Sequence, residues 1–111
     1  MNWQALSELT QLEEIRKESF DQPVLIYKHS VTCSISSTAK ARLERQWNDS
    51  TPIKAYYLDL LSYRSISNAI AQEFGVEHES PQVLLIQNGK CVYHESHFAI
   101  RFDEIVNAIA V

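Results

Sequence analysis

The sequence contains two thiols, and one of them stands in a pattern that can do chemistry. Cys33 opens the segment Cys33-Ser34-Ile35-Ser36, a C-x-x-S motif. In a C-x-x-C site one thiolate attacks a disulfide sulfur, and the second cysteine, one helical turn later, expels the bound partner. Serine at that place can keep a hydrogen bond to the thiolate but cannot expel the partner. The motif therefore predicts monothiol exchange, with Cys33 as nucleophile and Ser36 beside it.

A motif this short also fits a buried cysteine followed by a helix-capping serine, because free cysteine is among the most buried residue types. The position of the motif favours the reactive interpretation. An apolar run at residues 24–27 predicts a buried strand, and an apolar residue at every fourth position from Ile35 to Trp47 predicts a helix over about residues 34–48. Cys33 then lies where the strand ends and the helix begins, where free N–H groups and the helix dipole stabilise a thiolate.

The remaining patterns predict the elements that position this junction. They are a capping box at Thr10-Gln11-Leu12-Glu13, strands at residues 24–27, 53–61, 83–87 and 91–94, a helix cap at Ser62, a left-handed helix end at Gly75 and a hairpin turn at Asn88-Gly89, with residues 3–9 extended or irregular. This order of helices and strands is that of the thioredoxin fold. We therefore expect a single α/β domain over residues 1–111, with a four-stranded mixed sheet in the order 2-1-3-4 and helices on both faces.

Pro81 follows a polar stretch and precedes a predicted strand. The thioredoxin fold has a cis-proline at this place, facing the active cysteine, whereas an ordinary proline at a strand start is trans. The backbone of Ser80 could then pair with an incoming ligand, and Thr32 would form the opposite wall. We expect Thr32, Ser34, Ser80 and Pro81 to contact the substrate.

Four stretches, in this order along nearly the whole chain, resemble the monothiol bacilliredoxin family, the YtxJ-like proteins. They are Lys28-His29-Ser30-x-Thr32-Cys33-x-Ile35-Ser36, Arg64-x-x-Ser67-x-x-Ile70-Ala71, Gly75-Val76-x-His78-Glu79-Ser80-Pro81-Gln82 and Ser96-His97-Phe98-x-Ile100. The resemblance implies a thioredoxin fold, a single nucleophilic cysteine at Cys33, a cis bond at Pro81 and, as substrates, proteins S-thiolated by bacillithiol.

The sequence departs from the family pattern at two places. Ser34 stands where the family usually has proline, which removes a rigid helix-start residue and adds a donor. This change could alter the reactivity of Cys33. Phe98 replaces the family's tryptophan, and Arg101 stands where a capping threonine is common, which concerns only the last helix.

Three other residues have weaker predictions. His97 should return to the Cys33 end of the sheet, where it either contacts the thiol ligand or orders the turn into the last helix. Cys91, directly after the hairpin turn, should lie at the opposite end, too far from Cys33 for a disulfide, which needs Cα atoms within about 7 Å. His94 alternates along an edge strand and should face solvent. No histidine or acidic cluster has zinc-ligand spacing, so we expect no metal.

Composition and charge exclude several classes of function. The formal net charge is −4 and no Lys/Arg run occurs, which argues against nucleic acid binding. The longest apolar run, residues 83–86, is too short to cross a bilayer, and the N-terminus has no export signal. We therefore expect a cytoplasmic monomer with reduced thiols and no bound cofactor, which meets S-thiolated proteins and a low-molecular-weight thiol as co-substrate.

The leading prediction is thus an oxidoreductase that removes a low-molecular-weight thiol, bacillithiol on the resemblance, from protein mixed disulfides. One alternative is a non-catalytic thioredoxin-fold module that binds extended peptides around Pro81, with Cys33 structural. Another is a glutathione-dependent monothiol glutaredoxin. The Thr-Val-Pro and Gly-Gly-x-x-Asp elements that bind glutathione in that family are missing from this sequence.

Overall fold

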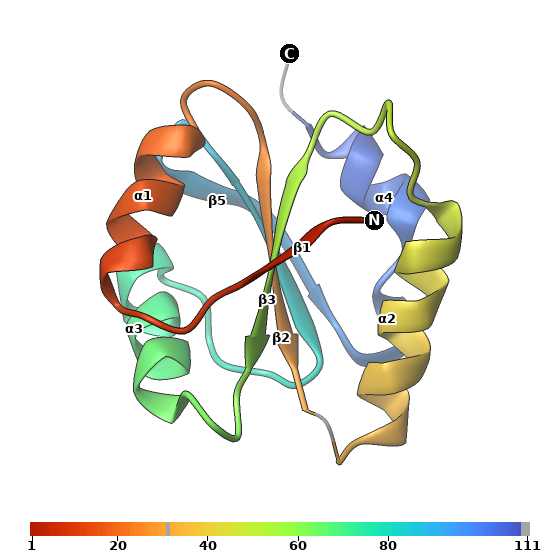
Figure 1. The fold of residues 1–111 in the computed structure, drawn as a ribbon, viewed down its shortest axis with the longest axis horizontal. Helices are drawn as coiled ribbons and strands as arrows, with labels where there is room; N and C mark the ends of the chain where they lie inside the picture. The colour runs from red at the N-terminus through yellow and green to blue at the C-terminus, as the bar shows by residue number, and fades with distance from the viewer. Residues whose placement is uncertain (31, 110–111) are drawn as a thin grey trace.

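The computed structural model describes residues 1–30 and 32–109 (Figure 1). In chain order its elements are β1 (Trp3–Ala5), α1 (Thr10–Glu18), β2 (Val24–His29), α2 (Ser34–Gln46), β3 (Lys54–Asp59), α3 (Arg64–Phe74), β4 (Gln82–Gln87), β5 (Lys90–Ser96), the 3-10 helix η1 (His97–Ala99) and α4 (Phe102–Asn107). None of the helices within these ranges is long and apolar enough to cross a membrane.

The five strands form one mixed sheet in the order β1-β3-β2-β4-β5. β2 is parallel to β3, and β4 is antiparallel to both β2 and β5. The order predicted for the four longer strands is confirmed. The prediction of only four strands is wrong, because β1 pairs in parallel with β3 at the edge of the sheet.

β1 owes its place in the sheet to contacts that are distant in the sequence. The Trp3 ring packs edge-on against the rings of Tyr27 and Tyr57, and its indole N–H donates to Glu44 Oε2 at 2.9 Å. The strand has only three residues, too few to show the alternation of apolar and polar side chains that identifies a strand in a sequence. The sequence pattern alone therefore leaves this segment undefined.

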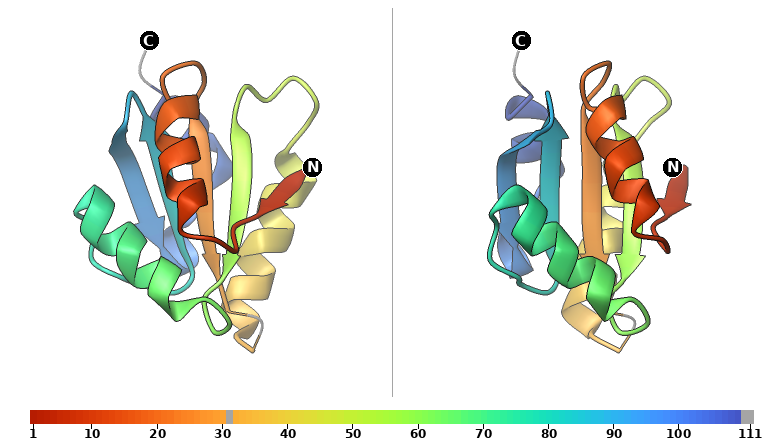
Figure 2. Two further views of the ribbon diagram at one scale, coloured as in Figure 1. Left: turned by 60° about the vertical axis from the view of Figure 1, so that its left-hand side comes forward. Right: turned by 90° about the vertical axis from the view of Figure 1, so that its left-hand side faces the viewer.

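The helices cover both faces of the sheet (Figures 1 and 2). α1 and α3 lie on one face, where Val24 and Ile26 of β2 join their apolar core. α2 and α4 lie on the other, where Leu25 and Tyr27 join a second core. β2 is buried along its whole length because it is the middle strand and both of its faces are covered.

The first helix begins differently from the prediction. Thr10 is already helical, and the N-cap residue, Leu9, makes no side-chain cap hydrogen bond, so the predicted capping box is wrong. The side chain of Gln11 instead fixes the segment before the helix, because its Oε1 accepts the backbone N–H groups of Ser7 and Glu8 at 2.8 and 2.9 Å. In the first turn of the helix, the Leu12 N–H donates to the Leu9 carbonyl at 3.1 Å.

The other signals at element ends have mixed outcomes. Ser62 is not the N-cap of α3, since that position is held by Tyr63 and the Ser62 hydroxyl donates to Asp59 Oδ2 at 3.0 Å. Gly75 ends α3 in the left-handed conformation with φ 66°, as predicted. Asn88 and Gly89 both have positive φ in the tight turn between β4 and β5, which confirms the hairpin.

Candidate active site

Cys33 lies at the junction that the sequence predicts. It is the N-cap residue of the 13-residue helix α2, with φ −105° and ψ 118°. Its carbonyl accepts the N–H of Ser37 at 3.1 Å, and its own N–H donates to the Ser30 carbonyl at 3.1 Å. The thiol is half-exposed and free. Cys33 is thus a partly exposed thiol at the N-terminal end of a helix.

Ser36 is fully buried beneath the start of this helix. Its Oγ lies 2.7 Å from His29 Nδ1 and accepts the backbone N–H of Ser30 at 3.1 Å. The Tyr27 hydroxyl donates to the Ser36 carbonyl at 2.7 Å, and burial raises the pKa of Tyr27 to about 12, so this donor keeps its proton. No hydrogen bond joins Ser36 to Cys33 within the described ranges. Ser36 therefore fastens the end of β2 to α2, and its part in the reaction stays a prediction.

His29 contacts Ser36, and the sequence did not predict where the His29 side chain points. The ring is buried, and this burial lowers the pKa of His29. The imidazole is therefore neutral at pH 7 and can exchange one hydrogen bond with the Ser36 hydroxyl without adding a charge. His29 thus belongs to the support of the site rather than to its exposed surface.

The Pro81 loop lies at the same end of the sheet as Cys33. The register pairs Lys28, five residues before Cys33, with Gln82, the residue after Pro81. The Ser80–Pro81 peptide bond is cis, as predicted. Two buried oxygens, Ser80 Oγ and Gln82 Oε1, have no hydrogen-bond partner in the described part of the chain.

His97 is held against this loop. Its N–H donates to the Pro81 carbonyl at 3.0 Å, and its Nε2 lies 3.0 Å from Glu79 Oε2. Its φ of 57° turns the chain from β5 into η1, which packs against α2. His97 therefore returns to the Cys33 end of the sheet and orders the turn, and its contact with a thiol ligand stays a prediction.

Thr32 and Ser34, the other two residues predicted to contact substrate, flank Cys33 and are exposed. Thr32 Oγ1 lies 3.3 Å from the hydroxyl of Ser30. The fold thus gathers the predicted substrate residues around one end of the sheet, and their contacts with a substrate stay a prediction.

Cys91 lies at the other end of the sheet, as predicted. It is paired with Ile86, which in turn is paired with Val24 at the start of β2. From Val24 to His29, at the end of β2, the strand advances about 16 Å at the usual rise per residue. The thiol is half-buried and donates to the Tyr93 carbonyl at 3.3 Å, and burial raises the pKa of Cys91. Neither its position nor its ionisation suits exchange with Cys33.

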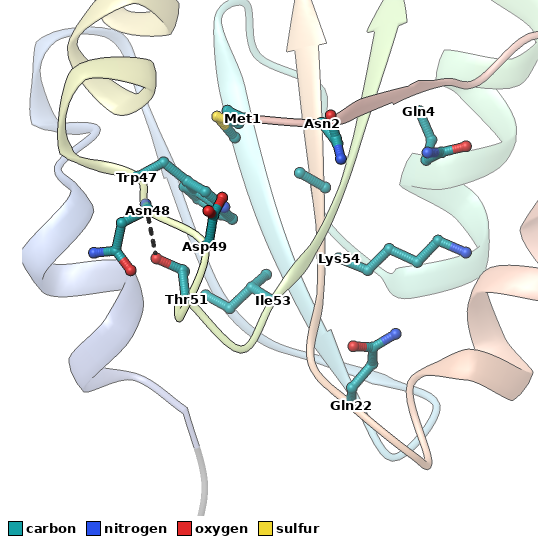
Figure 3. Close-up of a pocket in the computed structure, with 11 residues that line it drawn as sticks. Met1, Asn2, Gln4, Gln22, Trp47, Asn48, Asp49, Thr51, Ile53 and Lys54 are labelled. Carbon is teal, nitrogen blue, oxygen red and sulfur yellow. Dashed lines mark hydrogen bonds between the residues drawn. The ribbon is translucent and has the colours of Figure 1, made fainter.

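A second hollow and His94 lie outside this site. A hollow of about 300 Å³ opens near the start of β3 and the end of α2, where Trp47, Asn48, Thr51 and Lys54 line it, at the end of the sheet away from Cys33 (Figure 3). His94 faces solvent, as predicted. Within residues 1–30 and 32–109, no group of three or more His, Cys, Asp or Glu side chains could hold a metal ion.

A buried lysine is the feature that sequence reasoning missed. Lys28 has no exposed surface, and its Nζ lies 3.3 Å from the Ser67 carbonyl and 3.3 Å from His78 Nδ1. Burial lowers the pKa of Lys28 to about 8. The one signal for it was its register, since Lys28 follows Val24 and Ile26 at every second position of a strand buried on both faces.

Solved structures with the same fold include proteins with redox roles. A protein provisionally described as an oxidoreductase with a thioredoxin fold is 32% identical, with a TM-score of 0.78, over 94% of this chain and 90% of that protein. Spinach chloroplast thioredoxin f (12% identity, TM-score 0.73, 96% and 83% covered) and Malassezia sympodialis thioredoxin (17%, 0.71, 96% and 87%) share the fold. At such low identity the two thioredoxins show the fold alone.

The family comparison covers nearly the whole chain. Residues 4–105 match the family described as monothiol bacilliredoxin BrxC. Together with the 32% identical neighbour, this match supports a thiol-disulfide redox role. The chain has the thioredoxin fold and belongs to the monothiol bacilliredoxin BrxC family.

Proposed function

We propose that the protein removes a low-molecular-weight thiol, bacillithiol, from mixed disulfides on other proteins, with Cys33 as the nucleophile. The observation that carries this proposal is the contrast between the two thiols. Cys33 lies at the N-terminus of α2, at the Pro81 end of the sheet, whereas Cys91 lies at the far end of the sheet and burial raises its pKa. Both thiols are partly exposed, and only Cys33 directly precedes a helix and follows the central strand that pairs beside Pro81.

The reaction needs two exchanges. The Cys33 thiolate first attacks the small-thiol sulfur of the mixed disulfide. A bond forms between Cys33 and that sulfur, the original S–S bond breaks, and the target protein leaves as a thiolate that takes up a proton. A second small thiol then attacks the sulfur bound to Cys33, so that Cys33 leaves as a thiolate and the two small thiols leave as their disulfide. The target sulfur is reduced and the second small thiol is oxidised, while the sulfur of the first small thiol is in a disulfide before and after the reaction.

The surroundings of Cys33 support this chemistry. Ser80 Oγ is buried without a partner in the described part of the chain, so a ligand in the Pro81 loop would find an unused hydrogen-bonding group. His97, fastened to Pro81, forms part of the same wall. Ser36 Oγ accepts the Ser30 N–H and lies 2.7 Å from His29 Nδ1, so its hydroxyl proton is available to the thiolate only when it is not donated to His29.

The experiment follows the adduct mass of a test protein that carries one bacillithiol mixed disulfide. With bacillithiol present, the wild-type protein and Cys91→Ser should remove the adduct, and Cys33→Ser should not. Equal loss of activity in both variants would refute a monothiol mechanism. If the wild-type protein removes no adduct, the peptide-binding alternative is favoured. The same test protein with a glutathione mixed disulfide, and glutathione in place of bacillithiol, tests the third interpretation. Removal of the glutathione adduct but not of the bacillithiol adduct favours the glutaredoxin alternative.

The same proposal includes a setting for the protein. Thiol exchange of this kind requires Cys33 to be reduced at rest, which fits a cytoplasm kept reducing by small thiols. S-thiolated proteins would be its partners and the small thiol its co-substrate, with no resident cofactor and no need for a second copy of the chain. Sedimentation of the reduced protein would test the oligomeric state, and recovery of wild-type Cys33 adducts from cells would test the partners.

A further inference from the structure

The buried ammonium group of Lys28 has no counter-ion among the described residues. Its two contacts, the Ser67 carbonyl and His78 Nδ1, are uncharged acceptors, and none of the ion pairs in that part of the chain includes Lys28. The chain as a whole has an excess of acidic residues, with a net charge of −4. Buried charges in proteins are normally paired, because desolvation of an unpaired charge is costly. The lowered pKa of Lys28 has burial as its cause, as expected where no carboxylate offsets desolvation.

A small hollow opens on the same face of the sheet. It has a volume of about 90 Å³ and is lined by Leu60, Arg64, Ser67, Asn68 and His78. At roughly 30 Å³ for each water-sized group, it has room for a group such as a carboxylate but not for a large ligand.

The hollow has the electrostatics of an anion site. Arg64 is exposed and forms no ion pair with any described residue. It begins α3, whose first-turn N–H groups have no side-chain cap. His78 connects the hollow to the buried lysine, and the charges of Lys28 and Arg64 act on His78 against that of Glu79. Arg64 and the start of α3 therefore border a space whose described lining contains no acidic side chain, with Lys28 behind the Ser67 and His78 of that lining.

The protonation of His78 suits the same role. Its Nδ1 lies 3.3 Å from Lys28 Nζ and 3.2 Å from Ser67 Oγ, and the ammonium can only donate. Nδ1 is then the acceptor, and the ring proton is assigned to Nε2. The neutral ring keeps an N–H donor for an anion in the hollow.

The hollow lies at the Cys33 end of the sheet. The Leu60 N–H donates to the His29 carbonyl at 3.0 Å, which places this wall of the hollow against the last residue of β2. The Cys33 N–H in turn donates to the carbonyl of Ser30, the residue after the end of β2, at 3.1 Å. Cys33 therefore follows closely on the strand end that borders the hollow.

We propose that the hollow between Arg64 and His78, above Lys28, binds a carboxylate of the low-molecular-weight thiol that exchanges with Cys33. This inference rests on the proposed function and adds the substrate class: thiols that carry a carboxylate. The bound carboxylate supplies the counter-ion that Lys28 lacks. It also orients the thiol, because one end is held in the hollow while the sulfur reaches Cys33.

The test compares two thiols that differ by one carboxylate. A test protein is S-thiolated with cysteine in one preparation and with cysteamine in the other, and KM for removal of each adduct is measured. Arg64→Gln should raise KM for the cysteine adduct roughly tenfold, the effect of losing one charge-assisted hydrogen bond, and leave the cysteamine adduct unchanged. Arg45→Gln, an exposed arginine of α2, is the matched control. Lys28→Met should reproduce the Arg64→Gln effect, with folding checked by urea titration.

A second measurement keeps the inference separate from the proposed function. Cys33 is equilibrated with cystine and with cystamine, and mass spectrometry gives the fraction in each mixed disulfide. The wild-type protein should favour the cysteine adduct, and Arg64→Gln should remove this preference. Equal fractions in the wild-type protein, or a preference that survives in both Arg64→Gln and Lys28→Met, would overturn the carboxylate site. Normal adduct formation on Cys33 without removal of either thiol from the test protein would instead overturn the proposed function alone.

Discussion

Lys28 makes a prediction about stability that can be worked out from its burial. Desolvation lowers the pKa of Lys28 from 10.5 to about 8 in the folded protein. In the unfolded chain the side chain is exposed and has its ordinary value. Below pH 8 Lys28 is protonated in both states, so the whole penalty for burying the ammonium acts against folding. Between pH 8 and 10.5 the unfolded state binds more protons than the folded state, so the Lys28 contribution makes the protein more stable as the pH rises.

The size of the effect follows from the shift. A difference of about 2.5 pKa units corresponds to about 3 kcal/mol, at 1.36 kcal/mol for each unit. Replacement by methionine, which has a similar length and no charge, removes this contribution and leaves the apolar packing of the strand in place. The free energy of unfolding of Lys28→Met minus that of the wild-type protein should therefore fall by about 3 kcal/mol between pH 7 and 10.5.

The assay is urea unfolding of both proteins at several pH values over this range, with a reductant present to keep the thiols free. The comparison with Lys28→Met is needed because burial also raises the pKa of Tyr27, Tyr56 and Cys91, and these groups make folding less favourable at high pH. Their contributions are common to both proteins and cancel in the difference. A difference that stays constant from pH 7 to 10.5, or grows with pH, would refute the assignment of Lys28 as a buried, unpaired cation.

Three other predictions concern the same framework. Iodoacetamide at neutral pH should label Cys33 before Cys91, because burial raises the pKa of the Cys91 thiol; peptide mass spectrometry gives the order, and equal rates would contradict it. Ser36→Ala leaves the Ser30 N–H without its partner and should lower the free energy of unfolding by about 1–3 kcal/mol in urea, whereas Ser36→Thr, if it folds, tests whether the hydroxyl suffices. Gly75→Ala meets no atom within 4 Å, so its cost of about 1 kcal/mol in the same assay should come only from the left-handed backbone, and no loss would contradict that account.

The parts of the fold that the sequence predicts are those encoded by neighbouring residues. The order of the longer strands and helices follows from the spacing of apolar residues within each element. This spacing reflects which face of that element is buried, so it can be recognised from the element's own residues. Gly75 and the Asn88-Gly89 turn are readable because left-handed backbone restricts the choice of residue. The position of Cys33 follows in turn, since it needs only the end of β2 and the beginning of α2.

The parts that the sequence does not predict depend on contacts between distant segments. β1 is held by the Trp3 ring against residues more than 20 positions away, and three residues cannot show a period. The predicted capping box is not formed because α1 begins one residue earlier, with Leu9 as its N-cap and Thr10 already helical. The C-x-x-S motif suggests that the Ser36 hydroxyl contacts the Cys33 thiol. In the structure that hydroxyl contacts His29, the last residue of β2, and the motif does not contain this contact.

β2 joins the two halves of the proposed chemistry because its residues alternate between the faces of the sheet. Towards α2, Tyr27 and His29 hold Ser36 and so fix the helix that begins at Cys33. Towards α3, Lys28 lies beneath the hollow at Arg64. A methionine at position 28 would pack there without the desolvation penalty, so the charge of Lys28 makes the resting protein less stable. A bound carboxylate would offset the desolvation cost of Lys28, so this cost favours the carboxylate-bound state over the resting state. The proposed complex therefore has the substrate's carboxylate on the α3 face of β2 and its sulfur beyond the end of the same strand, at Cys33.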